Sequence, residues 1–466
     1  MHRVAGAPLD FAALRSELEV PGDFARSALD EALRAASAVH PEGFDARDIP
    51  FVTVDPPGSR DLDQALHIAK RGDSYLVSYA IADVAAFVEP GGALDLETRR
   101  RGQTYYFPDT RVPQLPPLLS EGAASLLPDQ DRPSVLWRIG LDGDGSVTDV
   151  DVRRATVRSR AQLDYAGVQR ALEQDSLPEA LRHLAEVGQL RQSAARARHA
   201  INLDLPAQEV VEVNGQWSLA LREPLPVEDY NAEISLLTGM CAAAMMLDAG
   251  VGILRTLPPA PSGAIEALQR IARSLGIEWP AGAAAGDVIG GLDRANPHQV
   301  ALIEHAVSLL RGAGYTPFDG AQPAQPLHAG IGAPYAHVTA PLRRLVDRFG
   351  TEICLAYSAG TAVPSWARDA LGEIATAMAA SDHLAHEVDR GVVDATEAWL
   401  LADRVGDVFS ALVLDAEDNG ADILLDAPAV RARCSGTHLP EGERITARLV
   451  EADVQTRRVR FDAVVG

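Results

Sequence analysis

The order of hydrophobic and polar residues divides the chain into a helical start, a mainly β stretch, a helical middle and a β-rich end. Near the N-terminus, Leu9, Leu14 and Leu18 share one face of a predicted helix, and a second amphipathic helix follows the Pro21-Gly22 turn. Two helices around a short turn are typical of half a helix-turn-helix module, or of a helical cap on the next domain. Both interpretations stay open.

Strands are predicted from Phe51 to about Val157, where β-branched and aromatic residues cluster between turn residues. The candidate strands are Phe51–Val54, Ala65–Ala69, Tyr75–Ile81, Ser134–Gly140 and Val147–Val157. The last two flank a turn at residues 142–145, which predicts a hairpin. Helical patterns follow at 164–203, from Val227, at 264–275 and at 298–312, with a short β stretch at 209–221.

Five short strands with turn residues between them are predicted after about Arg404, which is the pattern of a small barrel of the OB type. The candidates are Phe409–Asp415, Ala421–Leu425, Val430–Cys434, Arg444–Ala452 and Arg457–Val464. We therefore expect an α+β protein in three parts. These are a helical region at 1–50, a mixed β-sheet core wrapped by helices at 51–403, and the barrel at 404–466.

Composition narrows the class of protein. The 466 residues are 47% hydrophobic and 23% charged, as in ordinary globular proteins, and the net charge is -23. Such a charge opposes non-specific attraction to polyanions, so a nucleic-acid surface would have to be locally basic. The three cysteines predict no disulfide framework, and the longest apolar run, Ile234 to Leu247, is too short to span a bilayer. We expect a cytoplasmic protein without membrane contact.

Three aspartates surround one sharp turn. Asp55 ends the first predicted strand, Pro56-Pro57-Gly58 breaks it, and Asp61 and Asp63 follow. Residues two apart in an extended backbone point to the same face, and crowded carboxylates repel unless a cation lies between them. Mg²⁺ or Mn²⁺ bound by oxygen ligands would meet that need. The alternative is a solvated acidic turn.

A basic run leads into three aromatic residues between Arg99 and Pro108. Positive charge for phosphates and ring faces for bases are what a single-stranded nucleic-acid channel uses. Aromatic residues before a proline are also common in cores, so the alternative is a packing role.

A second anion site is predicted near residue 340. Thr339 is a good N-cap and Pro341 is tolerated in a first helical turn, so Arg343 and Arg344 would lie near a helix N-terminus. Backbone N–H groups and two guanidinium groups there favour a phosphate ligand. The alternative is a pair of surface arginines balanced by Asp347.

These motifs, in this order, resemble the ribonuclease II / ribonuclease R (RNB) family of exoribonucleases. The matches are Phe51–Ala65, Tyr79–Val84 with the 101–108 and 112–117 stretches, Tyr230–Ala244, and Thr339–Arg344. The resemblance covers about Phe51 to Leu401, with an S1-like OB barrel after it. It implies Mg²⁺-dependent (or Mn²⁺-dependent) 3′→5′ hydrolysis of single-stranded RNA to nucleoside 5′-monophosphates, with DNA not a substrate.

The resemblance also implies roles for individual residues. Asp55, Asp61 and Asp63 fall on metal-binding or catalytic aspartates, with Asp63 the most important, and Arg343 falls on the arginine at the scissile phosphate. The RNA-binding set is Tyr106, which clamps the last bases, Tyr165 and Glu233, which read the ribose 2′-hydroxyl, and the Arg343–Arg344 pair. The arginines of the barrel would supply local positive charge for the strand.

Two departures from the family pattern matter. Gln64 stands where the family has a fourth aspartate, and we expect its carbonyl to ligate the second ion more weakly. About fifty helical residues stand where the family carries cold-shock OB domains.

A monomeric enzyme is the leading interpretation. The alternatives are a catalytically weak or inactive RNA-binding relative, with Gln64 marking a decayed site, and a small-molecule phosphoesterase.

Overall fold

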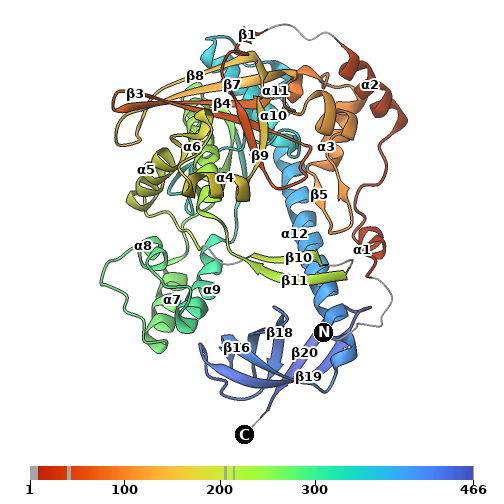
Figure 1. The fold of residues 1–466 in the computed structure, drawn as a ribbon, viewed down its shortest axis with the longest axis vertical. Coiled ribbons are helices and arrows are strands. Elements are labelled where there is room, and N and C mark those ends of the chain that lie inside the picture. Colours follow the sequence, from red (N-terminus) through yellow and green to blue (C-terminus); the bar gives the residue numbers. More distant parts are fainter. Residues whose placement is uncertain (1–8, 39–42, 204–206, 214–215, 465–466) are drawn as a thin grey trace.

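A computed structural model describes residues 9–38, 43–203, 207–213 and 216–464. A mixed β-sheet with helices on both faces forms the upper body in Figure 1, and a small barrel lies at the opposite end. The long helix α12 (Leu371–Leu401) runs between the two. The expected α+β architecture is confirmed.

The main sheet has seven strands in the order β1-β8-β7-β4-β3-β2-β9. Their bounds are β1 Phe44–Asp45, β2 Val52–Asp55, β3 Gln64–Arg71, β4 Ser74–Ala82, β7 Asp131–Leu141, β8 Val147–Arg158 and β9 Ala161–Asp164. β1 pairs with β8 and β2 pairs with β9 in parallel, whereas the other neighbours are antiparallel. The five predicted strands are present, and β1 and β9 extend the sheet at its two edges.

Side chains of the central strand β4 alternate between two separate hydrophobic cores, one on each face of the sheet. Val77, Tyr79 and Ile81 belong to the larger core, and Ala80 and Ala82 belong to a second core on the other face. This period of two is the reason why the sequence pattern located the strand correctly.

Helices cover the larger core. They are α4 (Tyr165–Glu173), α5 (Leu184–Ala197), α6 (Pro226–Ala249), α10 (Leu345–Ser358) and the start of α12. α6 is long and apolar enough to cross a membrane by length and composition, but it packs against α5, α10 and β12 (Val251–Thr256), and Ile234 and Leu237 are fully buried. The expectation of a core helix around Ile234 to Leu247 is therefore confirmed.

The two N-terminal helices contact different parts of the body. α1 (Ala12–Glu17) packs on α12, whereas α2 (Arg26–Ser37) packs on α3 (Ala93–Arg101) and on the turn Leu119–Ala123. Both helices therefore pack on the outside of the body.

Between α6 and the arginine motif the chain forms a pair of strands and three helices. β12 pairs with β13 (Gly314–Asp319), and α7 (Ser262–Ser274), α8 (Ala285–Gly290) and α9 (Pro297–Ala306) lie between them in sequence. A hairpin of β10 (Ala207–Val213) and β11 (Gln216–Arg222) packs on α12. Further short elements are β5 Tyr105–Tyr106, β6 Arg111–Val112, β14 Leu327–His328, β15 Ala333–Pro334 and α11 Ser365–Arg368.

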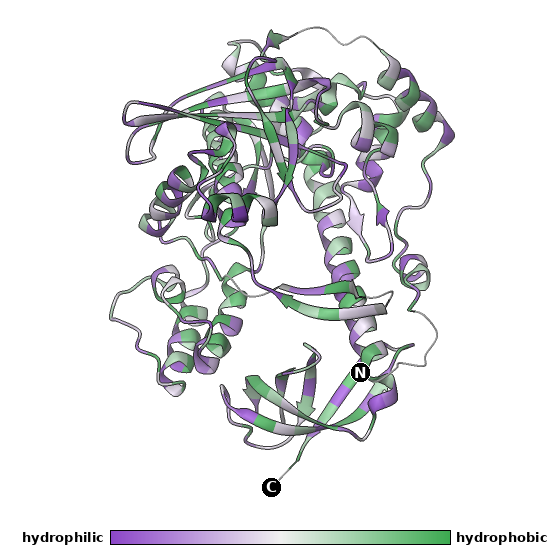
Figure 2. Cartoon of the chain, viewed as in Figure 1, coloured by the Kyte–Doolittle hydropathy of each residue, from purple (hydrophilic) through white to green (hydrophobic). Residues whose placement is uncertain are grey.

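The C-terminal strands close into a barrel in the order β16-β17-β18-β20-β19. They are β16 Val408–Glu417, β17 Gly420–Leu425, β18 Arg431–Ser435, β19 Arg444–Asp453 and β20 Arg458–Ala463. Hydrophobic and hydrophilic residues alternate along these strands in Figure 2. The predicted five-stranded OB-type barrel is confirmed.

α12 contributes to three hydrophobic cores along its length. Leu371 and Met378 belong to the core under the sheet, and Val388 packs with Phe11 in a core at the middle of the helix. Leu401, at the end of the helix, is buried in the core of the barrel. One continuous helix thus connects the body to the barrel.

Candidate active site

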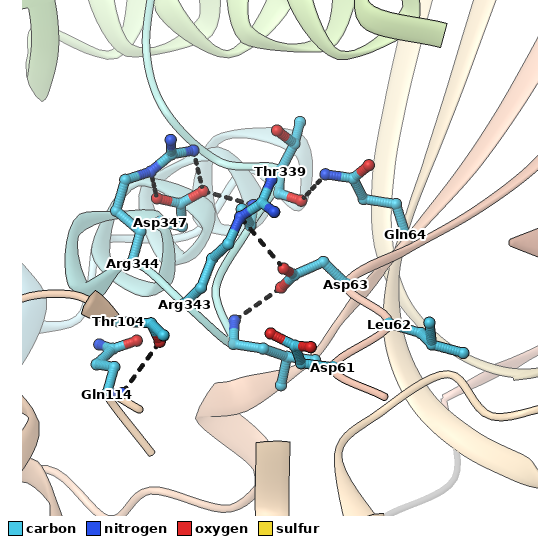
Figure 3. Close-up of polar contacts among 12 residues, drawn as sticks. Asp61, Leu62, Asp63, Gln64, Thr104, Gln114, Thr339, Arg343, Arg344 and Asp347 are labelled. Atoms are coloured by element: carbon cyan, nitrogen blue, oxygen red, sulfur yellow. Dashed lines mark hydrogen bonds and ion pairs between the residues drawn. The ribbon is translucent and has the colours of Figure 1, made fainter. Parts of the chain in front are cut away.

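The aspartate turn lies where β2 ends and β3 begins. Asp55 is the last residue of β2, and Gln64 is the first residue of β3. Asp61 and Asp63 are in the irregular segment between these strands, and Figure 3 shows their carboxylates close together beside the loop that carries Arg343. The three predicted aspartates are thus delivered by one strand end and one loop.

Asp63 is buried and is held by that loop. Asp63 is only 3% exposed. Its Oδ1 accepts a hydrogen bond of 2.7 Å from the backbone N–H of Leu342. Its Oδ2 lies 3.7 Å from Nε of Arg343. Burial raises the pKa of Asp63 to about 8, opposed by attraction to Arg343. A cation beside the carboxylate would restore its charge.

Asp55 is a second carboxylate whose negative charge is only partly balanced by its neighbours. Burial raises its pKa to about 6, opposed by Arg343 and assisted by repulsion from Asp61. Its Oδ2 is buried and has no hydrogen-bond partner in the described chain. An orphaned carboxylate oxygen next to further carboxylate oxygens is a donor set suited to a hard divalent cation. The residues present therefore fit Mg²⁺ or Mn²⁺.

Asp61 has a partner that the sequence did not reveal. Nη1 of Arg111 donates to Oδ1 of Asp61 at 2.7 Å, and Nη2 of the same arginine lies 2.7 Å from Glu121. Arg111 lies on β6, directly across from Tyr106 on β5. No spacing rule connects residues 61, 111 and 121, so sequence reasoning had no signal for this contact.

The arginine motif has a different local structure from the predicted one. α10 begins at Leu345, with Arg344 as its N-cap residue, so Thr339 is not a helix cap. Asp347, in the first turn of α10, instead accepts a hydrogen bond of 2.7 Å from the backbone N–H of Ala340. The physical reason is that this buried carboxylate holds the preceding residues in a loop, and the helix starts only after them.

The two arginines of the motif have different environments. Arg344 makes two bonds to Asp347, at 2.5 and 2.8 Å, so the predicted balancing by Asp347 applies to Arg344. The Arg343 side chain is 50% exposed and points toward Asp63 (Figure 3). Arg343 is therefore the guanidinium available to an anion at the aspartate turn.

The predicted channel of basic and aromatic residues is mostly wrong. Arg99, Arg100 and Arg101 end α3, and each is paired with a carboxylate of Asp95, Glu97 or Glu373. Tyr105 and Phe107 are buried, as the packing alternative anticipated.

Tyr106 is the exception in this stretch. It is 48% exposed and lines a hollow of about 370 Å³ together with Arg343, Arg344 and residues of α12. An exposed ring thus remains beside the arginine that faces the aspartates.

Tyr165 and Glu233 lie on neighbouring helices, α4 and α6. The hydroxyl of Tyr165 accepts a hydrogen bond of 3.4 Å from Nδ2 of Asn231, which sequence reasoning did not select. Glu233 is buried, and one of its carboxylate oxygens has no partner in the described chain. Burial raises the pKa of Glu233, opposed by Arg191 and Arg198. Unfilled hydrogen-bonding capacity therefore exists at this point.

The barrel does not present the basic surface that its arginines suggested. Six of them are paired with carboxylates: Arg404, Arg431, Arg433, Arg444, Arg457 and Arg460. From Arg404 onward the chain has eight arginines and eleven acidic residues. The expectation of a locally positive barrel is therefore wrong in the structure.

A separate group of potential metal ligands lies where α9 meets the barrel. His305, Asp415 and Glu441 each offer an atom within 4.8 Å of the others, in the part of the chain that the structure describes. Two of them are already hydrogen-bonded to each other, since His305 Nε2 lies 2.9 Å from Glu441 Oε1.

Comparisons with known proteins identify two domains in the chain. Residues 44–352 match the RNB domain, and residues 407–464 match the RNase II-type exonuclease C-terminal S1 domain. Ribonuclease R of Escherichia coli (strain K12) is 27% identical over 416 residues, which are 82% of this chain and 50% of that protein. The exosome complex exonuclease RRP44 of Homo sapiens is 29% identical over 321 residues, or 65% of this chain and 33% of that protein.

Solved structures share the fold. The apo form of Mycoplasma genitalium RNase R matches with a TM-score of 0.84 at 19% identity, covering 97% of this chain and 77% of that chain. Yeast Ssd1, described as a pseudonuclease, matches with a TM-score of 0.69 at 18% identity, covering 97% of this chain and 53% of that one. The chain spans about half the length of the ribonuclease R proteins of Escherichia coli and Shigella flexneri. Because the RNB domain accounts for more than half of its residues, the chain belongs to the RNB family.

Proposed function

We propose that the protein is a Mg²⁺-dependent 3′→5′ exoribonuclease that hydrolyses single-stranded RNA to nucleoside 5′-monophosphates. The observation that carries the proposal is the placement of Arg343 beside buried Asp63, with Asp55 and Asp61 on the same turn. Buried carboxyl groups with raised pKa values need a cation beside them to ionise, and the half-exposed guanidinium opposite them can bind a phosphate. Together they form a site for a cation and a phosphate.

Each side chain then has a role. Asp55, Asp61 and Asp63 would hold Mg²⁺, or Mn²⁺ in its place, which when bound activates a water molecule and neutralises phosphate charge. Arg343 donates to the scissile phosphate as negative charge develops on it. Asp63 is kept in place by Leu342, so the carboxylate and the arginine are presented from one rigid unit.

The substrate contacts follow from exposure. The ring of Tyr106 is free to stack on a base near the 3′ end. The unpartnered carboxylate oxygen of Glu233 and the hydroxyl of Tyr165 suit the ribose 2′-hydroxyl. That recognition is the reason why DNA is not proposed as a substrate. Structures of Mycoplasma genitalium RNase R contain ribose-methylated single-stranded RNA and double-stranded RNA.

We further propose that the protein acts as a monomer in the cytoplasm. Cys241, Cys354 and Cys434 are buried and unpaired, which suits a reducing compartment.

A second candidate is an RNA-binding protein with little or no catalysis. The observation in its favour is Gln64, a neutral residue beside the aspartates. A small-molecule phosphoesterase is disfavoured by the exposed Tyr106 and the barrel.

A time course on RNA with a 3′ single-stranded tail, labelled at its 5′ end in one sample and uniformly in another, decides between these functions. We expect progressive shortening from the 3′ end and release of mononucleotides with Mg²⁺, and none with EDTA. DNA of the same sequence should persist. Binding without shortening would select the RNA-binding candidate, and preference for a small phosphoester over RNA would select the phosphoesterase.

A further inference from the structure

Gln64 is fully engaged at both ends of its amide. Its Nε2 donates to the backbone carbonyl of Thr339 at 2.6 Å, the contact drawn in Figure 3. Its Oε1 accepts from the hydroxyl of Tyr79 at 2.8 Å, and that hydroxyl also shares a bond of 2.8 Å with Ser235. The amide therefore belongs to a chain of hydrogen bonds.

The orientation of the amide follows from the chemistry of its neighbours. The Thr339 carbonyl oxygen can only accept a hydrogen bond, so the nitrogen of Gln64 must face it. The oxygen of Gln64 then faces Tyr79, which is 1% exposed and has Ser235 as its other hydroxyl partner. Reversing the amide would place two oxygens against each other at one end.

This chain of hydrogen bonds connects the parts of the active site. Gln64 lies on β3, Tyr79 on β4 and Ser235 on α6, and Thr339 begins the loop that ends at Arg343. The neighbouring bond from Leu342 to Asp63 joins the same loop to the same turn. Two adjacent bonds thus fix the arginine loop against the aspartate turn.

A carboxylate at position 64 could still accept from Tyr79 but could not make both of these contacts. An ionised Asp or Glu has no N–H to donate to Thr339 and would place negative charge against a carbonyl oxygen. A metal ligand role for Gln64 would require its oxygen to be shared with, or released from, Tyr79.

We propose that Gln64 is a positioning residue, which sets the distance between the Arg343 loop and the aspartate turn, and not a ligand of the metal. The inference rests on the proposed function for its kinetic consequence. It also accounts for the neutral residue at this position without a decayed site.

Metal binding to the RNA-free protein is the first test, because it does not depend on activity. Mn²⁺ binding would be measured by calorimetry and paramagnetic resonance for the parent, Gln64→Leu, Gln64→Asp and Tyr79→Phe. Gln322→Glu is the matched control, since its Nε2 donates to the Leu247 carbonyl at 3.3 Å on an exposed loop. Equal Mn²⁺ affinity across the series is the expected result.

Two outcomes of this test would overturn the proposal. One is a loss of Mn²⁺ affinity of about tenfold or more in Gln64→Leu, as removal of a ligand or its support would produce. The other is tighter Mn²⁺ binding in Gln64→Asp. Because neither needs catalysis, an inactive parent protein would refute the proposed function while leaving this test of Gln64 intact.

The second test separates the catalytic rate from the metal requirement. At saturating Mg²⁺ and RNA, Gln64→Leu and Gln64→Asp should lower kcat by about tenfold or more, with the Mg²⁺ midpoint unchanged. Tyr79→Phe should lower kcat in the same way. Because this variant keeps the packing of the ring, it still tests the proposal if the Gln64 variants fold poorly. Gln322→Glu should match the parent. A kcat equal to the parent in Tyr79→Phe and in either folded Gln64 variant would contradict the proposal.

Discussion

Leu342 donates its backbone N–H to one oxygen of Asp63, and the next residue, Arg343, lies 3.7 Å from the other oxygen. Both oxygens of one buried carboxylate thus face two consecutive residues of a single loop. A carboxylate held in this way keeps one fixed orientation, so a phosphate bound by Arg343 and a cation bound by Asp63 would meet at a defined distance.

Asp63→Asn should lower RNA hydrolysis by about a hundredfold or more and leave RNA binding nearly intact. The amide keeps the shape of the side chain but removes the charge that a metal ligand must supply. Single-turnover cleavage and filter binding on the same labelled RNA measure the two effects. Retention of most of the rate would place the chemistry elsewhere.

Arg343→Gln should lower kcat by about 10² to 10³-fold, the usual cost of removing one preorganised donor from a reacting centre. Its half-exposed side chain makes little contribution to the fold, so the melting temperature should stay close to that of the parent. Steady-state kinetics with a thermal melt on the same preparation would show both results.

Arg344→Gln is the contrasting variant. It leaves the buried Asp347 without its bidentate partner, and breaking a buried ion pair costs about 3–5 kcal/mol. We expect a large fall in the melting temperature. A melt unchanged from the parent, with activity lost as in Arg343→Gln, would mean that Arg344 also contacts the RNA.

Tyr165→Phe combined with Glu233→Ala should narrow the preference for RNA over DNA. Each buried polar group left without the 2′-hydroxyl costs about 1–3 kcal/mol when DNA is bound, and the double variant no longer incurs that cost. The ratio of kcat/KM for matched RNA and DNA oligomers measures the effect. Asn231→Ala should show whether the partner of Tyr165 contributes to the same discrimination.

Glu397 should make stability depend on pH. Its Oε1 accepts bonds from Gln208 and from the backbone of Arg431, and burial raises its pKa to about 7. A raised carboxyl pKa destabilises the folded protein above the unfolded pKa. The penalty is therefore absent below about pH 4.5, grows up to pH 7 and is constant above it, at most about 3 kcal/mol.

Glu397→Gln keeps the accepting oxygen and removes the ionisation. Relative to the parent it should gain stability progressively from pH 4.5 to 7 and hold that gain at higher pH. Glu266→Gln, an exposed acid on α7, is the control. Parallel stability curves for Glu397→Gln and the parent would show that Glu397 does not titrate in this range.

The strands and the barrel were predictable because their signal is local. Val77, Tyr79 and Ile81 alternate with smaller residues that face the other core, and that period of two is written in the sequence itself. The order of the strands and the use of Val52–Asp55 between β3 and β9 required the folded chain.

The active site was only partly predictable, since its electrostatics depend on distant partners. The basic run at Arg99 resembled a phosphate surface, but Glu373 neutralises that arginine from 274 residues away. Thr339 satisfied a local capping rule that the buried carboxylate of Asp347 overrides through its bond to Ala340. Arg111, which binds Asp61, carries no local signal at all.

Helix α12 is part of both the body and the barrel, so its length sets the distance between them. Its 31 residues extend about 46 Å at 1.5 Å per residue, from the core under the sheet to Leu401 inside the barrel. An insertion of four residues would push the barrel away by about 6 Å and turn it by roughly 40°. The distance between the barrel and the aspartates is therefore set by the number of residues in α12. Each residue added to the helix or removed from it changes that distance and also rotates the barrel.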